Sequence, residues 1–236
     1  MNPAASIGEV TEHVDRGPLD KVELAARVAR DIPAGSYVNL GIGLPTTVAD
    51  HLDPAAGIVL HTENGMLGMG GVATGADIDP DLTNAGKVPV TETPGAAYFH
   101  HGDSFAMMRG GHLDVCVLGA FQVSGRGDLA NWHTDAPDAI PAVGGAMDLA
   151  VGARRVFVMM SLFARNGDCK LVRACTYPLT GLGCVSTVYT DYAVFDLTDG
   201  EVRVRETFGI SVSTLSERMD VSVTMPRRTP STPPAV

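Results

Sequence analysis

The sequence predicts an α/β domain with a mostly parallel sheet flanked by helices. Short apolar runs bounded by Gly, Asn or Asp recur along the chain and are typical of buried strands. They fall at residues 37–40, 58–62, 113–120, 155–163 and 192–197. Helical patterns and glycine turns lie between them. Strands that alternate with helices in this way favour a parallel sheet.

The helical elements are short. Over residues 20–30 the spacing of Val22, Ala25, Ala26 and Ala29 predicts an amphipathic helix, and Asp20 with Glu23 resembles a capping box. A short helix is expected over residues 46–52, after the glycine turn Gly41-Ile42-Gly43, and another after the turn at 144–145.

One domain accounts for the chain. Its 236 residues are 45% hydrophobic, which suffices for one sizeable core. We expect a flexible N-terminus over residues 1–17, one domain over 18–225 and a disordered Pro-rich tail over 226–236, where proline removes backbone donors.

The composition narrows the class of protein. A formal net charge of −10 argues against nucleic acid, whose phosphates bind clustered Lys and Arg. No apolar run is long enough to span a membrane, and the N-terminus lacks the apolar segment of a secretion signal. The four cysteines show no CxxC spacing, so we expect a reduced, cytoplasmic protein.

Several familiar kinds of site are disfavoured. Gly41 and Gly43 follow a strand, but Thr46 stands where a dinucleotide fingerprint needs its third glycine. Adjacent histidines such as His100-His101 point apart on a strand, which disfavours metal. Cys184 has the apolar neighbours of a small core residue. The turn at 41–43 remains either an oxygen-binding set of N–H groups or a plain tight connection.

Glu63 is the most informative single residue. It follows the apolar run IVLHT, at the end of a predicted strand, and precedes the glycine- and methionine-rich stretch GMLGMGG, which we interpret as a loop. Active groups in parallel α/β folds tend to lie at the carboxyl ends of strands. Apolar walls raise the basicity of a carboxylate. Spacing alone leaves two interpretations open: a catalytic carboxylate or a turn residue.

Seven ordered blocks between about residues 20 and 198 resemble the β subunit of family I CoA-transferases. They are NLGIGLP, TENGMLGMG, DLTNAGK, PGAAYFHHGDSFAMMRGGHLD, LGAFQVSGRGDLANW, VGGAMDL and CTYPLTGLGCVSTVYTDYAVFDL. Within the family, AIPAVGGAMDLAVGA is most similar to subunits that act on 3-oxoadipate. Where family members often carry an acidic residue followed by histidine, this chain has Ser161-Leu162.

The resemblance implies roles for individual residues. Glu63 would attack an acyl-CoA thioester and later carry CoA as a glutamyl thioester. The backbone N–H groups of Gly145 and Ala146 would form an oxyanion hole with a side chain from a partner subunit. The glycines after Glu63 would let the pantetheine arm approach. Residues that would contact CoA or line the site are Asn39, Gly41, Gly43, Lys87 and Asn131. From its sequence position alone, Lys87 remains either such a contact or a solvated loop residue.

The resemblance also implies an activity and partners. We expect transfer of CoA from succinyl-CoA to 3-oxoadipate in the breakdown of aromatic compounds, in an α2β2 assembly with a CoA-transferase α subunit. The CoA thioester would be a substrate, with no permanently bound cofactor. Acetoacetate or another short-chain 3-oxo acid is the alternative acceptor. A phosphate- or ligand-binding module of the same fold, and a thioesterase, are the alternative functions.

The binding of a dicarboxylate also needs a cation. Candidates for its distal carboxylate are Arg109, Arg126, His100 and His101, which the sequence does not rank, or a cation of the α subunit.

Overall fold

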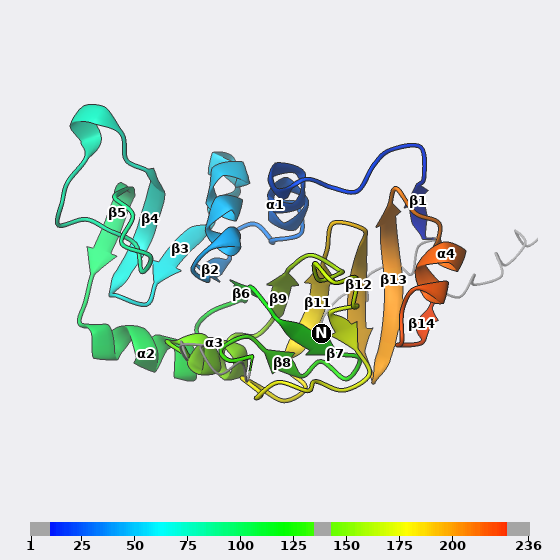
Figure 1. Ribbon diagram of the computed structural model, residues 1–236. Helices are drawn as coiled ribbons and strands as arrows, with labels where there is room; N and C mark the ends of the chain where they lie inside the picture. The colour runs from blue at the N-terminus through cyan, green and yellow to red at the C-terminus, as the bar shows by residue number, and fades with distance from the viewer. Residues whose placement is uncertain (1–9, 135–142, 226–236) are drawn as a thin grey trace, which may run out of the picture.

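The computed structural model describes residues 10–134 and 143–225. A large mixed sheet with the strand order β1-β13-β12-β11-β9-β6-β2-β3-β4-β5 runs through the molecule, and β14 pairs with β13 (Figure 1). Its strands are β1 (Thr11–His13), β2 (Tyr37–Leu40), β3 (Val59–Thr62), β4 (Met66–Val72), β5 (Val90–Tyr98), β6 (Val115–Leu118), β9 (Val156–Met159), β11 (Val185–Tyr189), β12 (Ala193–Thr198), β13 (Glu201–Phe208) and β14 (Val223–Thr224).

The centre of this sheet is parallel and its two sides are mixed. Strands β11, β9, β6, β2 and β3 are consecutive parallel neighbours. Antiparallel pairs join β3 to β4 and β4 to β5 at one side, and β11 to β12 and β12 to β13 at the other. The predicted mostly parallel sheet flanked by helices is therefore confirmed.

Helices cover both faces of the sheet. The α-helices are α1 (Lys21–Ala29), α2 (His101–Arg109), α3 (Ala146–Gly152) and α4 (Val212–Glu217), and the 3-10 helices are η1 (Leu44–His51), η2 (Pro54–Ala56) and η3 (Gly75–Asp77). A second sheet of three short strands has the order β10 (Leu171–Val172), β7 (Gln122–Ser124), β8 (Leu129–Ala130). In Figure 1, α1 and η1 lie above the large sheet, while α2, α3 and the second sheet lie below it.

Alternation along the central strands separates two cores. In β6, Val115 and Val117 pack into the core that contains α1, whereas Cys116 and Leu118 pack into the core that contains α2 and α3. Strand side chains point alternately to the two faces of a sheet, so a run that is apolar at every position is expected where both faces are covered. The uninterrupted apolar run of β6 (Val115–Leu118), inside the predicted segment 113–120, has this cause.

The sequence-predicted elements are largely present. The Asp20 side chain accepts the Glu23 N–H at the start of α1 while Glu23 reaches back to the Asp20 N–H, which completes the predicted capping box. The segment after Gly43 is a helix of the tighter 3-10 type and begins at Leu44 rather than at residue 46.

The N-terminal segment differs from its prediction. We expected residues 1–17 to be flexible, but Thr11–His13 form β1 and pair with β13, and His13 bonds Glu206 at 2.9 Å. Strand β1 is exposed and polar, and it is held mainly by backbone pairing with β13. Its sequence therefore carries no apolar pattern from which a strand could be predicted. Residues 1–9 and 226–236 lie outside the described residues.

A half-buried charge network ties α1 to the sheet. Asp31 accepts hydrogen bonds from Arg27 and from the Tyr189 hydroxyl, both at 2.7 Å, and pairs with Arg205. Burial alone would raise the pKa of Asp31, but the bonds from Arg27 and Tyr189 and the charge of Arg205 lower it. The network fixes α1 over one face of the sheet. None of the described helices has the length and apolarity of a membrane span.

Candidate active site

Glu63 lies in the tight turn between β3 and β4, directly after the last residue of β3. It is half-buried and stands at the carboxyl end of a strand that runs parallel to β2, as predicted. The next turn residues leave little choice of side chain. Gly65 has a φ of +114°, and a Cβ there would overlap the carbonyl oxygen of Phe99. The turn that presents Glu63 therefore requires glycine at position 65.

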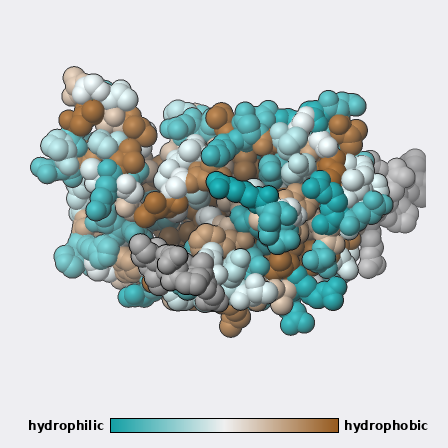
Figure 2. Space-filling model, in the orientation of Figure 1, coloured by the Kyte–Doolittle hydropathy of each residue, from teal (hydrophilic) through white to brown (hydrophobic). Residues whose placement is uncertain are grey.

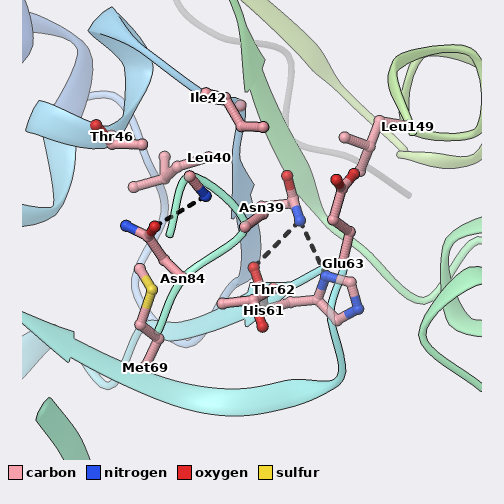
Figure 3. Close-up of a pocket in the computed structure, with 13 residues that line it drawn as sticks. Asn39, Leu40, Ile42, Thr46, His61, Thr62, Glu63, Met69, Asn84 and Leu149 are labelled. Atoms are coloured by element: carbon pink, nitrogen blue, oxygen red, sulfur yellow. Dashed lines mark hydrogen bonds between the residues drawn. The ribbon is translucent and has the colours of Figure 1, made fainter. Parts of the chain in front are cut away.

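A buried chain of hydrogen bonds lies directly beneath this turn (Figure 3). The Asn39 amide nitrogen bonds both the His61 carbonyl oxygen, at 3.1 Å, and His61 Nδ1, at 3.0 Å. His61 Nε2 lies 3.0 Å from Ser104 Oγ, which donates to the Thr62 carbonyl oxygen at 3.0 Å. All three side chains are nearly inaccessible, with exposures of 3%, 2% and 0% for Asn39, His61 and Ser104.

These contacts fix the direction of each bond. A carbonyl oxygen only accepts, so the atom of Asn39 that contacts it is the NH2 group, which then donates to Nδ1 as well. His61 therefore carries its proton on Nε2 and donates it to Ser104. A second proton on Nδ1 would point at the Asn39 NH2 group, which is itself a donor, so the protonated ring is disfavoured. Burial also lowers the pKa of His61 to about 4, with the Ser104 bond opposing, so the ring is neutral at pH 7.

The Glu63 carboxylate reaches across to the start of α3. A Cβ built on Gly145 would overlap Glu63 Oε2 and lie 3.3 Å from Phe105 Cζ. In Figure 3 the Glu63 side chain runs toward Leu149 of α3. The structure thus brings together Glu63 and Gly145, which the sequence places in separate blocks and to which the resemblance gives complementary roles.

A cavity of about 770 Å³ opens beside this contact. Its lining includes Glu63, Gly41, Gly145, Ala146 and Asn131 of the predicted site. A smaller cavity of about 30 Å³ adjoins it and is lined by Asn39, Gly41 and Glu63 among others. The face shown in Figure 2 is hollowed near its centre, with apolar (brown) residues on the floor of the hollow. The carboxylate thus stands where a large substrate can reach it.

The polar groups of this cavity are partly engaged with the protein. The Ala146 N–H donates to the Val143 carbonyl oxygen at 3.1 Å. In this state it is therefore engaged, and it is not available for the oxyanion hole that the resemblance implies. The Asn131 amide donates to the Gly119 carbonyl oxygen at 3.1 Å and accepts from the Thr180 hydroxyl at 2.6 Å. Asn131 therefore lines the cavity with a side chain that is already held in place.

Two predicted site residues line neither cavity. Gly43 directly precedes η1 and has a φ of +91°, and its neighbours Ile42 and Leu44 reach the cavities while it does not. Lys87 is exposed in a loop, with a φ of +61°. The Asn84 side chain closes this loop by accepting from the Gly86 and Val88 N–H groups. In this chain alone, Lys87 is a solvated loop residue.

The stretch after Glu63 is strand β4, not the predicted loop. A Cβ on Gly68 would lie 2.9 Å from Thr93 Oγ1, and one on Gly70 would overlap Thr91 Oγ1. These glycines allow β5 to pack closely on β4. At Gly68 and Gly70 the open side is filled by this chain's own strand, and clearance for a pantetheine arm by the glycines after Glu63 stays a prediction.

The remaining candidates have structural roles. His100 and His101 begin α2 rather than lying on a strand, and His100 Nδ1 accepts the Gly102 N–H at 3.0 Å. Burial raises the pKa of the Cys184 thiol to about 11, so it is protonated at neutral pH. No group of three His, Cys, Asp or Glu side chains suited to a metal occurs within residues 10–134 and 143–225.

Three positions of this candidate site escaped the sequence analysis. His61 is a polar residue inside the apolar run of β3, and Ser104 is a polar residue in α2. Neither belongs to a sequence motif that would indicate a role. Lys170 lies next to β10 and lines the cavity with Glu63, although the two are far apart in sequence. Of the unusual pair Ser161-Leu162, Ser161 lines the cavity and Leu162 is fully buried in the core below the sheet.

The model for the coenzyme A transferase family matches residues 21–208. The chain belongs to the coenzyme A transferase family. It is 60% identical over 188 residues to a Pseudomonas putida protein named as a subunit of 3-oxoadipate CoA-transferase, covering 80% of this chain and 88% of that one. It is 44% identical over 195 residues to a subunit of the succinyl-CoA:3-ketoacid coenzyme A transferase of Helicobacter pylori, covering 82% and 93%.

The fold agrees with this family. An acyl-CoA transferase of Escherichia coli O157:H7 superposes with a TM-score of 0.68 at 18% identity, over 95% of this chain. This chain spans 43% of that protein. The likeness at this identity concerns the fold. The family-wide blocks seen in the sequence supply the elements around Glu63: the β2 end, the β3–β4 turn, α2 and the α3 start.

Proposed function

We propose that this chain is the catalytic β subunit of a CoA-transferase that moves CoA from succinyl-CoA to 3-oxoadipate, with Glu63 as nucleophile. The observation that carries the proposal is the contact between the Glu63 carboxylate and Gly145 beside a cavity large enough for a substrate. The 60% identity to a subunit named for 3-oxoadipate favours this acceptor.

The chemistry proceeds through Glu63 in two mirrored halves. A carboxylate oxygen of Glu63 attacks the thioester carbonyl of succinyl-CoA, and the resulting oxyanion collapses to an anhydride and CoA thiolate. The thiolate attacks the glutamyl carbonyl, which leaves Glu63 as a CoA thioester and frees succinate. The carboxylate of 3-oxoadipate then attacks this thioester, and the thiolate released returns to the acyl carbonyl, restoring Glu63.

The backbone at the start of α3 would stabilise the oxyanions. The Gly145 N–H belongs to the residue that contacts the Glu63 carboxylate, where the tetrahedral centre forms. One such donor typically lowers the barrier by roughly 3–4 kcal/mol. The Ala146 N–H would contribute after release from Val143. We propose that Gly41 and Asn131 of the large cavity, with Asn39 of the small cavity that adjoins it, form the side that receives the substrate.

Further contacts come from a partner. The relatives are named as single subunits of their enzymes, and we propose an α subunit as partner in an α2β2 assembly. Domain bounds of 18–225 are proposed as predicted, with β1 added to the fold at the N-terminal side. Lys87, exposed here, would meet CoA only within such an assembly.

The test uses the complex with the α subunit from the same source. We expect succinyl-CoA to be consumed only when 3-oxoadipate is present, with formation of 3-oxoadipyl-CoA, and Glu63→Gln to reduce the rate on the order of 10⁴-fold. A higher kcat/KM for acetoacetate would reassign the acceptor. Release of free CoA without an acceptor would indicate a thioesterase. A complex that binds CoA and transfers none would contradict the function.

A further inference from the structure

The cavity beside Glu63 also contains cationic side chains. Among the residues that line it, Lys21 and Lys170 are the lysines, and no arginine or histidine of the described chain joins them. Both acids of the proposed reaction carry a second carboxylate at the end opposite to the reacting group. A carboxylate that enters a partly dry cavity needs a cationic or hydrogen-bonding partner.

Lys170 is held firmly at this cavity. Its N–H donates to the Leu162 carbonyl oxygen at 2.8 Å, and its carbonyl oxygen accepts from the Val123 N–H at 3.0 Å. These bonds place it just before β10, with its carbonyl oxygen paired to β7 of the second sheet. The backbone position is therefore fixed, and only the side chain can adjust to a ligand.

The Lys170 ammonium forms no ion pair with a described residue, although the Asp191 carboxylate acts on it from a longer distance. No carboxylate of residues 10–134 or 143–225 lies within 4.0 Å of its nitrogen. Its side chain is half-buried, and burial lowers the pKa of the ammonium, while the charge of Asp191 opposes this. The Asp191 carboxylate also lines the cavity but accepts the Leu162 N–H at 2.8 Å. A half-buried ammonium without an ion pair is stabilised by an anionic ligand.

The four cations proposed from the sequence do not compete for this role. Arg109 pairs with Asp148 at 2.6 Å and lines neither cavity near Glu63. Arg126 is exposed and lines neither cavity near Glu63. His100 caps α2, and His101 packs on Phe105 with ring centroids 4.8 Å apart. Lys21 does line the cavity, but it is the exposed first residue of α1.

We propose that Lys170 binds the distal carboxylate of the dicarboxylic acyl groups, both in the succinyl donor and in the 3-oxo dicarboxylic acceptor. This inference rests on the proposed function, which supplies the dicarboxylic substrates. It makes Lys170 the residue of this chain that distinguishes dicarboxylic from monocarboxylic acids of the same length.

The test compares 3-oxoadipate with 3-oxohexanoate, which lacks only the distal carboxylate. In a mechanism with two separate half-reactions, kcat/KM for the acceptor reports the acceptor's half alone. We expect Lys170→Met in the α–β complex to lower kcat/KM for 3-oxoadipate roughly 10- to 100-fold, the range for a lost hydrogen bond to a charged group. The value for 3-oxohexanoate should stay unchanged, and Lys170→Arg should keep most of the preference.

Lys21→Met is the matched control and should leave the ratio of the two acids unaltered. The proposal is overturned if Lys170→Met leaves the ratio of the two kcat/KM values unchanged, including the case in which both acids lose equally. It is also overturned if Lys21→Met changes this ratio instead. A second measurement needs no variant: calorimetry should show that adipate binds the unaltered complex more tightly than hexanoate, and equal binding would also overturn it. If succinyl-CoA gives no transfer to any acid, the proposed function has failed, and a comparison of adipate and hexanoate binding by the unaltered and the Lys170→Met complex still tests Lys170.

Discussion

The carboxylate of Glu63 lies so close to the backbone of Gly145 that a Cβ on residue 145 would overlap Oε2. Glu63 directly follows β3 and Gly145 precedes α3, two elements that meet only because the parallel centre of the sheet brings their ends to the same side. Glycine at 145 thus permits two things at once: the approach of the carboxylate and access to a backbone N–H.

Gly145→Ala should therefore impair the reaction more than the fold. The new methyl group displaces the flexible end of Glu63 from its position, and we expect kcat to fall roughly 100-fold or more, as when an oxyanion donor is lost. The melting temperature should change little, because the clash is with side-chain ends of Glu63 and Phe105. Gly71→Ala is the control, since its Cβ would meet nothing within 4 Å. Equal activity of the two variants would contradict this role for Gly145.

Ser104 should matter for the placement of Glu63 through its bonds to His61 and to the Thr62 carbonyl. Ser104→Ala leaves the buried His61 Nε2–H without an acceptor, which costs about 1–3 kcal/mol of stability. We expect a lower kcat with nearly unchanged KM for the acyl-CoA. Ser186→Ala is the matched control, because its hydroxyl donates to the Val156 carbonyl at 2.9 Å, away from the Glu63 turn. If both variants keep the full kcat, Ser104 acts on stability alone.

His61 should make stability depend on pH. Its pKa is lowered by burial to about 4 in the folded chain, below the value near 6.5 expected when unfolded. Between these values the unfolded state binds more protons, so the free energy of unfolding falls as the pH drops. The contribution is complete above pH 6.5 and is lost progressively toward pH 4, by on the order of 3 kcal/mol.

Urea unfolding of unaltered protein and of His61→Gln at several pH values between 4 and 7 checks this. The variant should be less stable at pH 7 and should lose part of the pH dependence in this window. Parallel curves for the two proteins would show that His61 is not the group responsible.

The Asp31 network should govern stability without governing catalysis. Asp31→Ala removes the acceptor that Arg27 and Arg205 share, while Arg27 keeps Glu206 and Arg205 keeps Asp196, so we expect a loss of roughly 1–3 kcal/mol. Glu201→Ala removes an exposed pair with Arg203 and should cost about 0–1 kcal/mol. Chemical denaturation measures both. A large drop in kcat for Asp31→Ala under conditions where it remains folded would point to an unforeseen link with the site.

The sequence predicted the parallel centre of the fold because its signals are local. The strand at 37–40 and the capped helix over 20–30 follow from apolar spacing and from Asp20 with Glu23. The β4–β5 hairpin was missed since its glycines are there for close strand pairing and Pro94 interrupts its pattern. The strands of the second sheet are only two or three residues long, too short for a periodic signal.

The residues of the candidate site also divide into those that the sequence could reveal and those that only the fold brings together. Glu63 and Gly145 stand in recognisable blocks, so a resemblance could find them. The hydrogen-bonded chain through Asn39, His61 and Ser104 depends on three elements that meet beneath one turn, and no spacing in sequence reveals it. Lys170 reaches the cavity only because β10 packs in the second sheet beside β7.

The central claim is a covalent CoA thioester on Glu63. The complex with the α subunit is incubated with succinyl-CoA, reduced with borohydride and digested, and the peptide with residue 63 is examined by mass spectrometry. We predict conversion of the Glu63 carboxyl to a primary alcohol, with Glu92, exposed on β5, left as a carboxylate. An unmodified Glu63 in a complex shown to bind CoA would contradict the account and leave Glu63 as a residue of the β3–β4 turn.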